Sequence, residues 1–128
     1  MEVSGKKFYN ADGAEMECMA LLKSVGMNTI RLRLWANPTE SWNNTADLLI
    51  KAKKANALGM RIMIDFHYSD TWAYTSHQTK PTAWTSLSFA DLKTAVGNHT
   101  TEVLNALKTN GVNPEWVQVG NETSNGML

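Results

Sequence analysis

The sequence lacks most of the features that mark specialised protein classes. Its single cysteine, Cys18, excludes a disulfide within the chain. The charges of its twelve basic and twelve acidic residues cancel. The chain therefore lacks the positive net charge that would favour a nucleic acid or an anionic membrane as a partner. There is no run of about 18 apolar residues that would span a membrane, and the polar residues 1–8 hold no signal-like apolar segment. A hydrophobic content of 43% excludes a disordered chain, which leaves one globular domain or a piece of a larger one.

Helical and strand-like patterns alternate along the 128 residues. Apolar residues at helical spacing predict helices over Ala14–Val25, over Ala46–Leu58 after an N-cap at Thr45, and from Ser88 to a stop at Asn110-Gly111. Alternating residues predict strands over Thr29–Trp35, Arg61–His67 and Trp116–Gly120. Because a helix stands between successive strands, the pattern predicts right-handed crossovers and a parallel sheet in an α/β fold.

Each predicted strand has one apolar and one polar face, because side chains of a strand alternate. A doubly wound sheet needs two apolar faces, whereas one apolar and one charged face suit a closed parallel barrel with helices outside. In such barrels catalytic groups project inward at the C-terminal ends of the strands. Four polar side chains are predicted to lie there: Arg33, Asp65, His67 and Glu122.

Each of these residues also has a purely structural interpretation. An ion pair with an arginine explains Asp65, and a hydrogen-bonded core histidine explains His67. A glutamate that lies just past the end of a strand, as Glu122 does, is commonly a solvated surface residue. Arg31 and Arg61 stand nearer the strand starts, where we expect ion pairs at the floor of the barrel.

The segment Tyr68–Leu87 is a long loop, and long loops in compact domains are commonly functional. Its tryptophans offer flat apolar faces that suit the C–H-rich faces of sugar rings. Trp72 suits either sugar stacking or anchoring of the loop, whereas Trp84, close to the next helix, is expected to anchor.

Four segments carry a family resemblance: Thr29–Pro38 (TIRLRLWANP), Met60–Trp72 (MRIMIDFHYSDTW), Lys80–Trp84 (KPTAW) and Pro114–Leu128 (PEWVQVGNETSNGML). They resemble glycoside hydrolase family 53, the arabinogalactan endo-β-1,4-galactanases. The resemblance implies a partial (β/α)8 TIM barrel, to which this chain contributes parallel strands two to four with the surrounding helices. Residues 1–128 are then the N-terminal part of a catalytic domain, without its first strand and its C-terminal half.

The resemblance also implies retaining hydrolysis of internal β-1,4-galactosidic bonds in type I arabinogalactan and pectic galactan. Glu122 matches the acid/base of the family's Gly-Asn-Glu motif, and Asn121 matches the asparagine that binds the sugar hydroxyl next to the reacting carbon. Arg33 matches the second-strand arginine that supports the nucleophile. The positions around the subsite for the cleaved sugar are matched by Asp65, His67 and Trp72. One departure is Trp72-Ala73-Tyr74, where the family commonly reads Trp-Ala-Asp.

Retaining hydrolysis uses two carboxyl groups, so no cofactor and no metal are expected. The family's nucleophile, on the seventh strand, is not among these residues, and the chain by itself is expected to be inactive. The expected partner is galactan or arabinogalactan, without nucleic acid or membrane. The complete enzyme is expected to be a monomer that is secreted, periplasmic or held on the outer surface.

Two alternatives stay open from the sequence. The chain could belong to another retaining β-glycanase of the same barrel clan. It could also be a non-catalytic carbohydrate-binding module that uses Trp72 and Tyr74, although the inward acid set argues against a simple binding platform.

Overall fold

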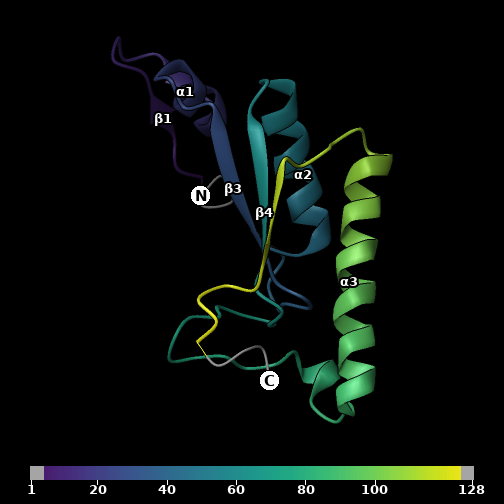
Figure 1. Cartoon of the computed structure of the whole chain (residues 1–128). Helices are drawn as coiled ribbons and strands as arrows, with labels where there is room; N and C mark the ends of the chain where they lie inside the picture. The colour runs from purple at the N-terminus through teal and green to yellow at the C-terminus, as the bar shows by residue number, and fades with distance from the viewer. Residues whose placement is uncertain (1–4, 125–128) are drawn as a thin grey trace.

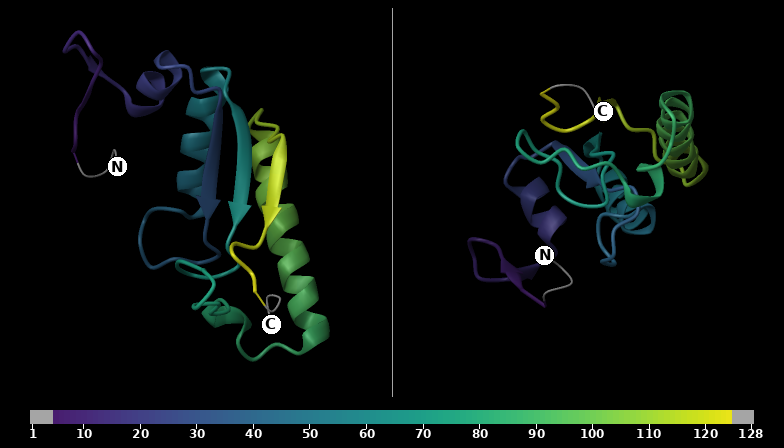
Figure 2. Two further views of the ribbon diagram at one scale, coloured as in Figure 1. Left: turned by 60° about the vertical axis from the view of Figure 1, so that its left-hand side comes forward. Right: turned by 90° about the horizontal axis from the view of Figure 1, so that it is seen from below.

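A three-stranded parallel sheet forms the centre of the computed structural model, which describes residues 5–124. In spatial order its strands are β3 (Thr29–Leu34), β4 (Arg61–Phe66) and β5 (Trp116–Val119). Two crossover helices lie on one face of the sheet, α2 (Thr45–Ala57) and α3 (Phe89–Thr109) (Figure 1). All three strands point to the same end of the molecule, where the loops that follow them gather (Figure 2). A short 3-10 helix, η2 (Thr82–Trp84), interrupts the long loop between β4 and α3.

The N-terminal part of the chain differs from the predicted helix over Ala14–Val25. Its elements are β1 (Phe8–Tyr9), β2 (Glu15–Met16) and α1 (Cys18–Ser24), and the two strands pair antiparallel. Asn10 explains the difference, because its side-chain oxygen accepts hydrogen bonds from the backbone amides of Asp12 and Ala14 at 3.1 and 2.8 Å. Such local bonds stabilise a turn at the expense of a helix.

The helix ends follow the predicted caps with small shifts. Asn44, and not Thr45, is the N-cap of α2, where its side-chain oxygen accepts from a first-turn amide at 2.9 Å. Ser88 caps α3 as predicted, accepting from the amide of Asp91 at 3.2 Å and donating to that carboxylate at 2.6 Å. Gly26 ends α1 with a φ of 98°, a conformation that glycine adopts without strain.

The hydrophobic core lies between the sheet and the two crossover helices. The predicted apolar faces of the first two strands are buried in it through Leu32, Leu34, Ile62, Ile64 and Phe66. The helices contribute the predicted stripes, with Leu48, Ala52, Ala55, Leu92, Val103 and Leu107 buried. Burying a side chain of leucine size stabilises a fold by about 1.5–3 kcal/mol, so this interface is the main source of stability.

The apolar face of β5 departs from this pattern. Val117 and Val119 alternate as predicted, but 38% and 61% of their surface is exposed. Within residues 5–124, α2 packs against β3 and β4 and no helix buries these two valines. The predicted split into an apolar and a polar face is therefore confirmed for all three strands, because the register aligns Val117 and Val119 with the buried Ile64 and Phe66. The apolar face of β5 differs only in being left largely uncovered by the described residues. No helix among residues 5–124 is long and apolar enough to cross a membrane.

Candidate active site

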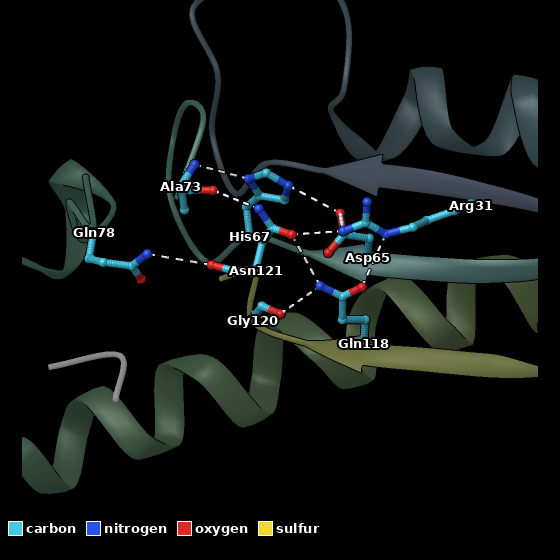
Figure 3. A network of polar contacts seen from close by, with 8 residues as sticks. All are labelled: Arg31, Asp65, His67, Ala73, Gln78, Gln118, Gly120 and Asn121. Carbon is cyan, nitrogen blue, oxygen red and sulfur yellow. Dashed lines mark hydrogen bonds and ion pairs between the residues drawn. The ribbon is translucent and has the colours of Figure 1, made fainter. Parts of the chain in front are cut away.

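The polar face of the sheet carries a network of hydrogen bonds and ion pairs near the C-terminal ends of the strands (Figure 3). The strand register puts Arg33, Asp65 and Gln118 side by side on β3, β4 and β5. Only 1% of the Asp65 surface is exposed. A carboxylate buried to this degree needs charged or hydrogen-bonding partners.

Arg31 is the centre of the network. Its Nη2 lies 2.8 Å from Asp65 Oδ2 and donates to Asn121 Oδ1 at 2.7 Å. Its Nε donates to Gln118 Oε1 at 3.0 Å. One side chain from β3 therefore reaches across β4 to Gln118 in β5 and to Asn121, two positions after that strand. The predicted ion pairing of Arg31 is confirmed, but its contacts extend to the candidate catalytic end of the sheet.

A second ion pair lies at the opposite end of the sheet. Arg61, the first residue of β4, donates through Nε and Nη2 to the carboxylate of Glu115, as its predicted ion-pair role requires. The hydrogen bond and the charges raise the pKa of Arg61 and lower that of Glu115. The Arg61 guanidinium also lies 4.2 Å from the ring centroid of Trp116. This pair lies at the end of the sheet where the strands begin, remote from the candidate catalytic residues.

His67 is a buried histidine with both ring nitrogens occupied. Its Nδ1 accepts from the backbone amide of Ala73 at 3.0 Å, and its Nε2 lies 3.1 Å from Asp65 Oδ2. Because Nδ1 accepts, the ring proton sits on Nε2 and is donated to Asp65. His67 therefore connects the loop after β4 to the network. Among residues 5–124, no group of three His, Cys, Asp or Glu side chains is arranged to hold a metal ion.

Asn121 is 6% exposed, and both ends of its side-chain amide are bonded. Its Oδ1 accepts from Arg31 and, at 3.2 Å, from Gln118 Nε2, while its Nδ2 donates to the backbone oxygen of Ala73 at 2.7 Å (Figure 3). These partners assign the orientation of the amide. Gly120 supplies the turn before it, with a φ of 86° that favours glycine.

Glu122 is exposed, in contrast to the buried Asn121 that precedes it. Its side chain is exposed, and its Oε2 accepts from the amide and the hydroxyl of Thr75 at 3.3 and 3.2 Å. Its backbone oxygen accepts from Gln78 Nε2 at 3.2 Å. Its φ of 48° lies in the left-handed region, which is uncommon for residues other than glycine. The carboxylate thus lies against the loop after β4 and remains open to solvent.

Arg33 and Trp72 lie against one another. The Arg33 guanidinium carbon is 3.5 Å from the Trp72 ring centroid, a cation–π geometry. The Trp72 ring meets the rings of Trp35 and His67 edge-on at 6.2 and 5.7 Å, yet half of its surface is exposed. Burial lowers the pKa of Arg33, and the nearby Asp65 carboxylate opposes that shift. Trp72 is thus anchored by its neighbours while half of its surface stays accessible.

The loop between β4 and α3 is tied down at two points. Asp70 accepts from the backbone amides of Asn37 and Thr82 at 3.0 and 2.8 Å, which joins the loop after β3 to the loop after β4. Tyr74 and His77 close a tight turn by two reciprocal backbone hydrogen bonds of 3.0 and 2.8 Å, and their rings stack at 5.5 Å. This turn holds the segment that contacts Glu122.

Trp84 anchors the end of the loop, as predicted, by packing against the core. Its ring centroid lies 6.5 Å from that of Tyr68 and 5.9 Å from that of His99. The Tyr68 hydroxyl forms a 2.8 Å hydrogen bond with Thr100. Burial lowers the pKa of His99, and the charge of Glu102 opposes that shift.

All six candidate residues from the sequence stand near this end of the sheet: Arg33, Asp65, His67, Trp72, Asn121 and Glu122. The structure adds four that were not assigned to the site: Arg31, Thr75, Gln78 and Gln118. Strand parity places Arg31 and Gln118 on the polar face. The local sequence gives no signal that Thr75 and Gln78 fold back onto residues 121–122.

Comparisons with known sequences all point the same way. The chain matches the family model of glycosyl hydrolase family 53 over residues 1–128. It is 38% identical over 127 residues to the probable arabinogalactan endo-β-1,4-galactanase A of Aspergillus fumigatus, a match covering 99% of this chain and 36% of that protein. It is 39% identical over 134 residues to the endo-β-1,4-galactanase of Bacillus subtilis, covering 98% and 31%. The chain thus spans about a third of the length of these curated relatives.

Solved structures share the fold of the chain. A fungal β-1,4-galactanase superposes with a TM-score of 0.89 at 34% identity, over 94% of this chain and 36% of that one. The GH53 catalytic domain of Ignisphaera aggregans gives a TM-score of 0.86 at 39% identity, over 92% and 35%. These neighbours are TIM barrels, so the parallel sheet β3–β4–β5 with its helices is a partial (β/α)8 barrel, as predicted.

Proposed function

The chain belongs to glycosyl hydrolase family 53, and on that premise we propose that residues 1–128 form the N-terminal part of the catalytic barrel of a retaining endo-β-1,4-galactanase. The proposed substrates are type I arabinogalactan and pectic galactan, cut at internal β-1,4-galactosidic bonds. The names of the Aspergillus and Bacillus relatives support this substrate class. A polymer of this size favours an enzyme that is secreted, periplasmic or on the outer surface, and we expect it to act as a monomer.

The contrast between Asn121 and Glu122 carries the proposal. The Asn121 amide is buried and held by three partners, whereas the adjacent Glu122 carboxylate is exposed. A fixed amide suits a hydrogen bond to the sugar hydroxyl beside the reacting carbon. An accessible carboxyl group suits proton transfer to the glycosidic oxygen.

The proposed reaction has two displacement steps. A second carboxylate, from outside the residues assigned here, attacks the anomeric carbon while the bond to the leaving oxygen breaks and Glu122 gives its proton to that oxygen. The Glu122 carboxylate then takes a proton from water, and the water oxygen displaces the nucleophile from the anomeric carbon. Two inversions retain the configuration, which requires the carboxyl groups about 5–5.5 Å apart.

The remaining candidates are assigned to substrate binding. Trp72 offers a half-exposed ring for stacking on a sugar, with Arg33 against its face. Asp65 and His67 hold the loop that carries Trp72, through the bond between His67 and Ala73. This assignment gives the buried pair a role in shaping the subsite for the cleaved sugar.

The decisive experiment uses the full-length protein that contains this chain. We expect it to release galacto-oligosaccharides from β-1,4-galactan, with the β-anomer formed first in proton NMR. Glu122→Gln should lower kcat by roughly 10²–10⁴-fold. Glu115→Gln is the matched control, because it neutralises a carboxylate at the opposite end of β5 that pairs with Arg61.

Other outcomes separate the alternatives. Faster cleavage of mannan or cellulose than of galactan would assign the chain to another β-glycanase. Galactan binding that is indifferent to Glu122→Gln, without cleavage, would indicate a binding module. We expect the 128-residue chain alone to cleave no galactan, since it supplies one of the two proposed carboxyl groups.

A further inference from the structure

We propose that Thr75 and Gln78 are positioning residues that orient Glu122 for proton transfer, an inference that rests on the acid/base role proposed above. Both belong to the loop after Trp72, and both contact residues more than forty positions later in the chain. Neither would touch the substrate in this role. They act on it through Glu122.

Gln78 holds the backbone at Glu122. Its Nε2 lies 2.6 Å from the backbone oxygen of Tyr74 and 3.2 and 3.5 Å from those of Glu122 and Asn121, so one N–H can serve Tyr74 and the other the pair that follows β5. Glu122 has a left-handed φ of 48°, which persists in a non-glycine residue only where the surroundings enforce it. The Gln78 amide joins the turn to this strained residue and so supplies part of that enforcement.

Thr75 determines which carboxyl oxygen of Glu122 carries the proton. Its amide and its hydroxyl both lie within hydrogen-bond distance of Oε2, at 3.3 and 3.2 Å. Among residues 5–124, Oε1 accepts no hydrogen bond. In the protonated acid an oxygen that accepts two hydrogen bonds is disfavoured as the site of the proton. The proton is therefore held on Oε1, the oxygen left free for the glycosidic bond.

The turn that contains Thr75 and directly precedes Gln78 is itself fixed to the buried network. Tyr74 and His77 close it by two backbone hydrogen bonds and ring stacking. Just before it, Ala73 donates to His67 and accepts from Asn121, and both of these partners are buried. The position of Thr75 and Gln78 is thus set by the same network that holds Asn121.

The test compares variants of the full-length protein on galactan and on aryl β-galactobiosides. Thr75→Val removes one donor to Oε2 and should lower kcat on galactan by about 5-fold, the value of one ordinary hydrogen bond. Gln78→Glu keeps the shape but sets a carboxylate against the three backbone oxygens that Nε2 approaches, and should lower kcat by about 10- to 100-fold through misplacement of Glu122. We expect KM on galactan to stay near its original value for both variants.

The leaving group distinguishes positioning of an acid from a structural role. A 2,4-dinitrophenolate leaves without proton assistance, whereas the sugar oxygen of galactan requires it. For both variants, kcat/KM should therefore approach that of the unsubstituted protein with 2,4-dinitrophenyl galactobioside and fall progressively with phenyl derivatives of higher pKa. Thr79→Val is the matched control, because that hydroxyl lies 3.3 Å from the ring of His77 instead of contacting Glu122. This variant should have the same kcat/KM as the unsubstituted protein on every substrate.

An equal loss on all leaving groups, or no loss on galactan, would overturn the positioning role. Should Gln78→Glu fail to fold, as judged by its thermal unfolding, Thr75→Val carries the test alone. Glu122→Gln separates the two proposals. If it leaves galactan cleavage unchanged, the acid/base assignment fails. If it abolishes cleavage while the Thr75 and Gln78 variants behave as the unsubstituted protein does, only the positioning role fails.

Discussion

Arg31 Nη2 lies 2.8 Å from Asp65 Oδ2, and the two side chains have very different exposure, 50% for the arginine and 1% for the aspartate. The other carboxylate oxygen, Oδ1, is buried and has no hydrogen-bond partner among residues 5–124. Among residues 5–124, Arg31 is the only arginine or lysine that forms an ion pair with Asp65, while the Arg33 guanidinium acts on that carboxylate through its charge alone. The dependence runs mainly one way, because water can solvate the arginine and not the aspartate.

Removing Arg31 should therefore destabilise the protein more than removing Arg61. Arg31→Met keeps the apolar stem and leaves Asp65 buried without its counter-charge, which should lower the free energy of unfolding by about 2 kcal/mol. Arg61→Met breaks the exposed pair with Glu115, whose charges are screened by water, and should lower the free energy of unfolding distinctly less. Denaturant unfolding of both variants checks the difference. Equal losses would contradict the assigned importance of the buried carboxylate.

His99 should make stability depend on pH. Burial holds its pKa below the ordinary 6.5, so the unfolded chain binds the proton more tightly than the folded chain. The stability that the neutral His99 side chain contributes is therefore fully present above pH 6.5. It is lost as the pH falls from 6.5 towards the pKa that His99 has in the folded protein. The substitution His99→Phe keeps a ring beside Trp84 and Tyr68 and should make the stability depend less on pH. Thermal unfolding from about pH 8 to pH 5 measures it, and parallel curves for the two proteins would refute the assignment.

The N-cap of α3 should be worth a measurable part of the stability. Ser88→Ala removes the acceptor for the Asp91 amide and should lower the free energy of unfolding by about 1 kcal/mol. Ser86→Ala, an exposed serine two positions earlier, is the matched control and should change stability by less than about 0.5 kcal/mol. The prediction fails if the two alanine variants unfold at the same denaturant concentration.

Trp72 should contribute to galactan binding in the full-length protein. Trp72→Ala removes the half-exposed ring, and a stacking contribution of about 1.4 kcal/mol corresponds to a tenfold rise in KM. Trp42→Ala truncates a tryptophan of similar exposure, 44%, that has not been placed at the site. A KM that rises equally in both variants would show a general effect of lost aromatic surface instead of a sugar contact at Trp72.

Strand alternation made much of the site predictable. Because side chains alternate strictly along a strand, Arg33, Asp65 and Gln118 had to share a face once the strands were recognised. The reach of Arg31 was not predictable in this way. Its long stem carries the guanidinium beyond its own register position to Asn121, so a residue expected at the floor bonds at the opposite end.

Contacts between segments that are distant in the sequence could not be predicted from the local residue pattern. The contact between Thr75 and Glu122 joins residues 47 positions apart, and only the folded loop brings them together. The periodic Met16, Met19 and Leu22 suggested one continuous helix, yet the turn at Asn10 and the pairing of β1 with β2 displaced its start. Pairing across a turn depends on two segments at once, which a single periodicity does not record.

Asp70 accepts from backbone amides in two loops that are far apart in the chain, and it should therefore couple their amide exchange. Its two oxygens protect the amides of Asn37 and Thr82 separately, so a single rotation of its side chain releases both to solvent. The two amides should therefore exchange with deuterium at correlated rates, as one cooperative opening unit. Asp70→Asn would retain one acceptor oxygen and should accelerate exchange at one amide while sparing the other. The two loops would then open separately, each with its own kinetics.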